Sequence, residues 1–172
     1  MNCFLPYPDF AKSAACLDDK RLGKQRIECL QILRCLCGYS NGWKNHPAVK
    51  MWEGFHDGLL RYGRAICAEW TQRGFKDTCE DKMLKTFTDW ANDKSGAPNL
   101  VAVMLFVTSG RPPWLGDEVF HRSHQSNLVR KDPAHYRQFF PDVPDDLPYV
   151  WPTKEARFFT AGEETAGYNT LT

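Results

Sequence analysis

The chain has 172 residues, the usual length of one domain, and 42% of them are apolar, which is enough to build a hydrophobic core. No apolar run reaches the roughly eighteen residues of a membrane span, so we expect no membrane-spanning helix. The amino terminus lacks the regions of a secretory signal, and we therefore expect a cytoplasmic protein. The formal net charge of +1 by itself neither indicates nor excludes a nucleic-acid partner.

The cysteine pattern indicates thiols buried in the core. Seven cysteines occur, an odd number, and most lie in helical patterns beside apolar residues. No CxxC pair is present, and Cys35 and Cys37 have no matching pair at zinc-ligand spacing. A metal or disulfide role is the alternative. We predict free thiols in a reducing compartment, with no metal and no cofactor.

In chain order, the first third predicts two helices. Prolines disfavour a helix over residues 1–9, after which Asp9 or Ser13 can cap a short helix. Asp18 is a suitable N-cap for a long helix over residues 20–37, where apolar residues recur near helical spacing.

The middle of the chain predicts one long amphipathic helix. Pro47 stands where a first turn favours proline, and apolar residues repeat every three or four positions before Gly74 ends the pattern. Thr78 with Asp81 resembles a capping box, so a further helix is expected to begin there.

The last third is less regular. The run 100–108 is apolar and β-branched, and its periodicity does not separate a buried helix from a strand. A helix is predicted over 118–130, and Asp132 before a proline predicts another through Phe140. Residues 141–152 are expected to be irregular.

These elements predict an all-α fold, a compact single-domain helical bundle with at most one short irregular or strand segment near 100–108. The domain is expected over residues 1–155, followed by a loosely held tail over 156–172.

The long helix 20–37 carries a polar face around one carboxylate. Its members share helical spacing: Arg21, Lys24, Gln25, Glu28 and Gln31. A solvated face with helix-stabilising ion pairs is the simpler interpretation. In the alternative, the cations bind phosphates and lower the pKa of Glu28, whose carboxylate then stabilises positive charge on a sugar during glycosidic bond cleavage.

A second polar cluster follows the apolar middle of the chain. Its candidates for phosphate and base contacts are His121, Arg122, Ser123, His124, Asn127, Arg130 and Lys131. A buried histidine pair with satisfied hydrogen bonds is one alternative, and a two-histidine metal site is another. His46, before Pro47, is either a helix cap or part of an anion site.

Several segments resemble the pyrimidine-dimer DNA glycosylase family of the phage endonuclease V type, and its short bacterial and phage members most closely. The similar stretches are Phe4-Leu5-Pro6-Tyr7-Pro8-Asp9-Phe10, Arg21-Leu22-Gly23-Lys24-Gln25-Arg26, Asn45-His46-Pro47 and Arg122-Ser123-His124. The resemblance extends over about residues 1–140.

The resemblance implies an all-α protein that binds double-stranded DNA with a damaged or modified base, displaces a base from the stack and breaks its N-glycosidic bond. It places the essential carboxylate at Glu28, with Arg21, Lys24 and Arg26 as phosphate or sugar contacts. The family uses an α-amine exposed by loss of Met. Asn2 disfavours that loss here, so the Met1 α-amine is the candidate nucleophile and Cys3 the alternative.

The sequence therefore predicts a DNA N-glycosylase for a damaged or modified pyrimidine, with AP-lyase activity if the amine reacts. Aromatics such as Trp43, Trp114 or Tyr7 either stack on the displaced base or fill its gap, or belong to the core. A non-catalytic binder of distorted DNA, a nucleoside- or nucleotide-processing enzyme and a structural role are the alternatives. We assume a monomer.

Overall fold

The computed structural model describes residues 1–95, 110–152 and 168–171, and this part of the chain is mostly helical, as predicted. In chain order its elements are α1 (Phe10–Ala15), α2 (Asp19–Leu36), α3 (Pro47–Lys50), α4 (His56–Gln72), α5 (Cys79–Ser95), α7 (Glu118–Lys131), α8 (Pro133–Tyr136), β1 (Tyr149–Pro152) and β2 (Tyr168–Leu171). The apolar run 100–108 lies outside the described residues.

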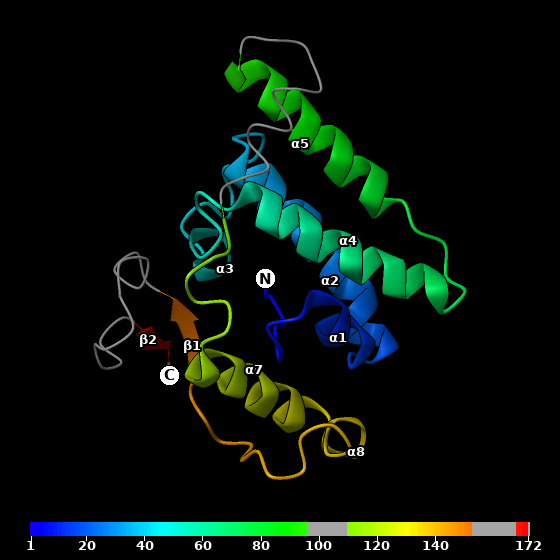
Figure 1. Cartoon of the computed structure of the whole chain (residues 1–172), viewed down its shortest axis with the longest axis vertical. Helices are drawn as coiled ribbons and strands as arrows, with labels where there is room; N and C mark the ends of the chain where they lie inside the picture. The colour runs from blue at the N-terminus through cyan, green and yellow to red at the C-terminus, as the bar shows by residue number, and fades with distance from the viewer. Residues whose placement is uncertain (96–109, 153–167, 172) are drawn as a thin grey trace.

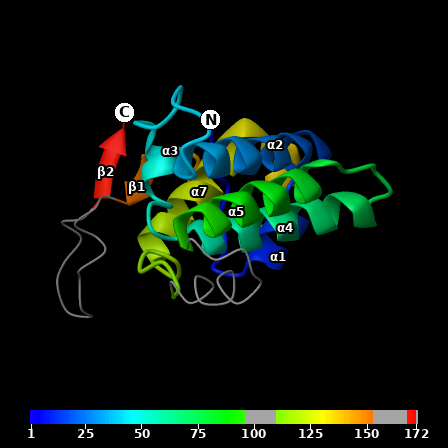
Figure 2. The ribbon, with the colours of Figure 1, turned by 90° about the horizontal axis from the view of Figure 1, so that it is seen from above.

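The core lies between helices α2, α4 and α5, which run side by side (Figure 2). Leu22 and Ile32 of α2, Ile66 of α4 and Met83 of α5 are all fully buried. Burial of each such side chain stabilises the fold by about 1.5–3 kcal/mol. Gly63 allows α4 to approach α5, because a Cβ there would lie 2.7 Å from the Met83 sulfur.

The predicted helix starts at Asp9, Asp18 and Asp132 are confirmed, since each carboxylate accepts a hydrogen bond from a backbone amide of its helix. The prediction for α5 is wrong in detail. Asp77, and not Thr78, accepts from the amides of the first turn, at 3.0 and 2.9 Å.

The single helix predicted from Pro47 to Gly74 is wrong, because the chain forms the separate helices α3 and α4. Gly54 between them has a φ of +83°, a left-handed conformation that interrupts a right-handed helix and favours glycine. The helix predicted through Phe140 also ends earlier, at Tyr136.

The amino-terminal segment runs through the interior between α2 and α7 (Figure 1). Cys3 and Leu5 are fully buried. The Leu5 amide donates to His124 Nδ1 at 3.1 Å, and the Tyr62 hydroxyl donates to the Phe4 carbonyl at 2.6 Å. These contacts hold residues 4 and 5 in the interior, close to the first residue of the chain.

Strands β1 and β2 form an antiparallel pair in which Tyr149 is opposite Leu171. The sequence predicted residues 141–152 to be irregular, which is wrong for β1, and it did not predict β2. The Val150 amide of β1 donates to Ser123 Oγ at 3.2 Å, so α7 holds this strand.

All seven cysteines are buried free thiols, as predicted. No helix in the described part of the chain is both long and apolar enough to cross a bilayer.

Candidate active site

The chain begins beside the buried carboxylate of α2. Glu28 Oε1 lies 3.8 Å from the Met1 amine nitrogen and 3.7 Å from Lys24 Nζ. Glu28 is only 4% exposed, and its other oxygen, Oε2, has no hydrogen-bond partner among the described residues. Buried polar atoms are normally paired, so an unpartnered carboxylate oxygen beside an amine makes Glu28 a candidate for chemistry.

Burial raises the pKa of Glu28, and the charges of Lys24 and the terminal amine offset this only in part. The sequence-based expectation of a lowered pKa was therefore wrong. That expectation counted the cations around Glu28 but not the loss of water around the carboxylate, which has the larger effect. A raised pKa makes the ionised carboxylate a stronger base.

The two basic stretches of the sequence meet at this site. The Arg21 guanidinium of α2 donates to the Lys131 carbonyl of α7 at 3.1 Å. The pKa of Lys131 is lowered by burial and then by the positive charges of Arg21, Arg130 and Lys24, which places these cations near one another. Arg21 also pairs with Asp18 and lies over the Tyr136 ring.

Two other candidates of α2 are engaged within the protein. Gln25 Nε2 donates to the Asn2 carbonyl at 3.1 Å, and its Oε1 accepts from the Phe4 amide. Gln25 thus holds the amino-terminal segment in place. Arg26 pairs with Asp77 and stacks on Trp70, 4.2 Å from the ring centroid, so its guanidinium is not free for a phosphate.

His46 caps α3 through Nδ1, which accepts from the Ala48 amide at 3.1 Å. Burial and then the charge of the terminal amine lower the pKa of His46, so this ring lies near the Met1 amine. Trp43, which is 50% exposed, and Trp151 both contact the His46 ring. Figure 2 shows the N terminus beside α2 and α3. Trp114, the second aromatic candidate, is 1% exposed and belongs to the core.

The histidines and serine of α7 are buried in contacts with the backbone. His121 Nδ1 lies 2.7 Å from the Leu5 carbonyl, and its Nε2 accepts from the Gly116 amide. His124 Nδ1 accepts from Leu5, while Nε2 is buried without a partner among the described residues. Ser123 Oγ donates to the Phe120 carbonyl. These side chains position the amino-terminal segment and β1.

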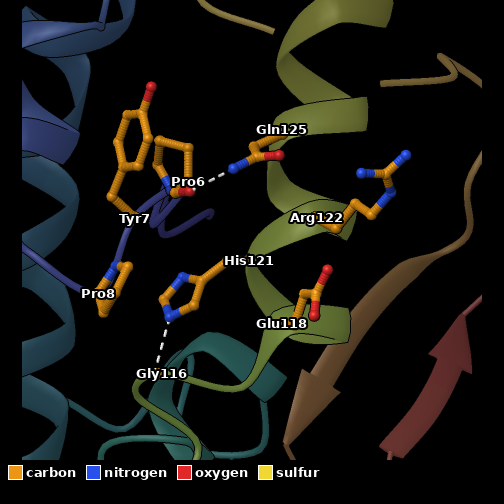
Figure 3. A pocket seen from close by; sticks show the side chains of 8 residues that line it. All are labelled: Pro6, Tyr7, Pro8, Gly116, Glu118, His121, Arg122 and Gln125. Carbon is orange, nitrogen blue, oxygen red and sulfur yellow. Dashed lines mark hydrogen bonds between the residues drawn. The ribbon is translucent and has the colours of Figure 1, made fainter. Parts of the chain in front are cut away.

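His121 and Arg122 line a separate pocket of about 280 Å³ between the amino-terminal segment and α7 (Figure 3). Tyr7, the third aromatic candidate, is also in its wall. The pocket shares no lining residue with the Met1–Glu28 pair.

The remaining α7 candidates differ in their exposure to solvent. Arg122 and Arg130 are exposed and donate to the carbonyls of Asp142 and Leu147, at 3.4 and 2.8 Å. Asn127 Oδ1 is buried and has no partner within the described ranges. The described part of the chain contains no group of three or more side chains suited to bind a metal ion.

Sequence reasoning missed Asn2 and Tyr149. The Tyr149 hydroxyl lies 2.7 Å from Asn2 Oδ1 and 3.0 Å from the Cys3 carbonyl, and thereby fixes the segment that presents the amine. No signal in the sequence joins two residues 147 positions apart. Cys3, the alternative nucleophile, is fully buried, and burial raises the pKa of its thiol to about 12. It is therefore not a thiolate near neutral pH.

The structure thus defines a helical protein in which the Met1 amine lies beside the buried Glu28 carboxylate, with Lys24 and Lys131 near that carboxylate. Residues 1–83 match the family model described as pyrimidine dimer DNA glycosylase. The matched segment is slightly less than half of the chain and contains Met1, Glu28 and helices α1 to α4, whereas the α7 candidates lie beyond it. No curated protein and no solved structure matches the chain.

Proposed function

We propose that the protein is a DNA N-glycosylase that removes a damaged or modified pyrimidine and that the Met1 α-amine is its nucleophile. The observation that carries this proposal is the 3.8 Å approach of the amine to the buried Glu28 carboxylate. The family match of residues 1–83 supports the same class of activity.

In the proposed reaction, the uncharged amine attacks C1′ of the deoxyribose. The bond from C1′ to the base breaks, and its electron pair leaves with the base, which then takes up a proton. Glu28 stabilises the positive charge that develops on the sugar and accepts the proton that the amine loses. Its raised pKa suits the second role. The nitrogen lone pair then forms the C1′=N bond of an imine as the C1′–O4′ bond breaks and O4′ takes up a proton. This imine with the protein is the intermediate that an AP-lyase step requires.

The DNA is proposed to lie over the cations around this site. Lys24, Arg130 and Lys131 are exposed; Lys24 lies 3.7 Å from Glu28, and Lys131 lies near both Glu28 and Arg130. We propose that the three cations contact phosphates on both sides of the displaced base. Trp43 is exposed beside His46, and we propose that it stacks on a base or fills the gap that the base leaves. Arg21 shapes the site through its contacts with Asp18 and Lys131.

The test uses labelled duplexes that carry normal, dimer-damaged or modified pyrimidines, with borohydride present to trap an imine. We expect base release and a trapped covalent adduct from one damaged or modified duplex. Glu28→Gln should lower the rate of release by about 10²–10⁴-fold and change the DNA affinity by less than about threefold.

Glu80→Gln is the matched control, because this partly exposed carboxylate pairs with Arg64 and, among the described residues, with no group of the Met1–Glu28 site, so the rate should stay unchanged. Salt-sensitive binding without base release from any duplex would refute the glycosylase proposal and favour a DNA reader. A covalent adduct that persists in Glu28→Gln would refute the role of the carboxylate.

A further inference from the structure

A cationic pocket lies between α2 and α5, away from the Met1–Glu28 pair. Its volume is about 390 Å³, and its lining comes from both helices and the loop after α2: Arg34, Tyr39, Lys82, Lys85, Thr86 and Asp89. The two helices run in the same direction, because Arg26 pairs with Asp77 just before α5 and Arg34 meets α5 further along. None of these pocket residues contacts Met1 or Glu28.

The pocket has an excess of positive charge. Three cations and one carboxylate leave two net positive charges, and Lys85 Nζ pairs with Asp89 at 2.9 Å. Among the described residues, Lys82 donates only to the Thr78 hydroxyl, at 3.3 Å, and Arg34 has no ion pair. Cations with hydroxyl groups beside them are the usual protein ligands of a phosphate.

An exposed stripe on α2 connects this pocket with the active site. Its members follow one another at intervals of four and three residues: Lys20, Lys24, Ile27, Gln31 and Arg34. Such spacing keeps them on one face of the helix. Glu28 lies beside Lys24 of the stripe and near Lys131 of α7, whereas Arg34 of the stripe lines the pocket with α5. Arg34 follows Lys24 by ten positions, which is about 15 Å along the helix.

We propose that the pocket between α2 and α5 is a second phosphate-binding site, which holds the DNA backbone across α2 from the reacting base. The inference rests on the proposed function only in that the ligand is DNA. Double-stranded DNA carries one charge per roughly 1.7 Å of its axis, so a duplex lying along the stripe brings several phosphates to this end of α2. The site adds affinity without touching the reacting atoms.

The test is the salt dependence of binding to an undamaged duplex. Each phosphate contact contributes about 0.9 to the slope of log K against log salt concentration, so the double variant Arg34→Ala/Lys82→Ala should lower the slope by about 1.8. Asp89→Asn removes a repulsive charge and frees Lys85, so it should tighten binding several-fold. Lys12→Ala on α1 is the control, since Figure 2 shows α1 on the opposite side of the molecule from α2.

An unchanged slope in the double variant, with its melting temperature intact, would overturn the proposal. Inorganic phosphate separates the two possible sources of the ligand. If millimolar phosphate stabilises the wild type and not the double variant while the DNA slope is equal in both, the pocket binds free phosphate and not DNA. Base release is scored separately: a normal slope change without base release refutes only the glycosylase function.

Discussion

Helices α2 and α7 carry polar clusters that look alike in the sequence, yet the fold uses them differently. In α7 the ring nitrogens of His121 and the Nδ1 of His124 are engaged with the amino-terminal segment and Gly116. In α2 the Glu28 carboxylate keeps one oxygen unpartnered among the described residues and approaches the Met1 amine. The two α7 histidines thus hold the backbone of the amino-terminal segment, whereas the Glu28 carboxylate of α2 remains available for chemistry.

The physical reason is the path of the first residues. Their buried backbone needs hydrogen-bond partners, since an unpaired buried amide or carbonyl costs about 1–3 kcal/mol. Gln25, His121 and His124 supply these partners. With its backbone satisfied in this way, the segment can place its amine beside a carboxylate that would otherwise be an unfavourable buried charge.

The largest expected effect tests the chemical side of this comparison. Two residues, Gly-Ser, are added before Met1, which moves the free amine by up to about 7 Å. We expect the borohydride-trapped adduct to fall at least about 100-fold, while the affinity for DNA changes by less than about threefold. The adduct is measured by gel shift after reduction.

Mass spectrometry must show that the wild-type protein begins at Met1 and the extended one at the added glycine. An extended protein that forms the adduct at the wild-type rate would contradict a role for the Met1 amine.

The structural side of the comparison is tested by His124→Ala. The ring is fully buried, accepts from the Leu5 amide and packs 4.2 Å from the Phe120 ring centroid. Its loss should lower the free energy of unfolding by about 3 kcal/mol, measured by urea denaturation. Lys24→Ala, at an exposed site, should cost less than about 0.5 kcal/mol but lower the rate of base release about tenfold. A stable His124→Ala variant together with a destabilised Lys24→Ala variant that keeps its rate would contradict this division between α7 and α2.

The smallest effect concerns the stability cost of Glu28. Its pKa is raised in the folded state, so between the unfolded and folded pKa values the native protein binds more protons than the unfolded chain. The free energy of unfolding therefore falls as the pH rises through that window and stays lower above it. Glu28→Gln should remove this fall. At pH 7 the variant should melt at the same temperature as the wild type or about 2–4 °C above it.

Thermal melts from pH 4 to pH 8 measure this difference, with Glu80→Gln as the control. The rate of wild-type base release should also fall on the acid side as Glu28 becomes protonated. A wild-type–variant difference in stability that is flat across pH would show that Glu28 has the same pKa in both states.

The sequence by itself determined the helical class and most helix starts. A capping aspartate such as Asp18 and apolar residues at helical spacing act over a few residues, so they can be predicted locally. The resemblance to the family and the choice of Glu28 also came from the sequence. The break at Gly54 was missed because the apolar repeat continues across it. The partner of β1 was missed because four residues carry too little pattern.

Only the tertiary structure decided which polar residues face solvent and which serve the backbone. Arg26 and Lys24 share a helix and a charge, but Asp77 and Trp70 engage the first while the second stays exposed beside Glu28. The direction of the Glu28 pKa shift depends on burial, which no local spacing specifies. The pairing of Asn2 with Tyr149 and the meeting of α2 with α7 join distant positions, and such contacts arise only when the chain packs its core.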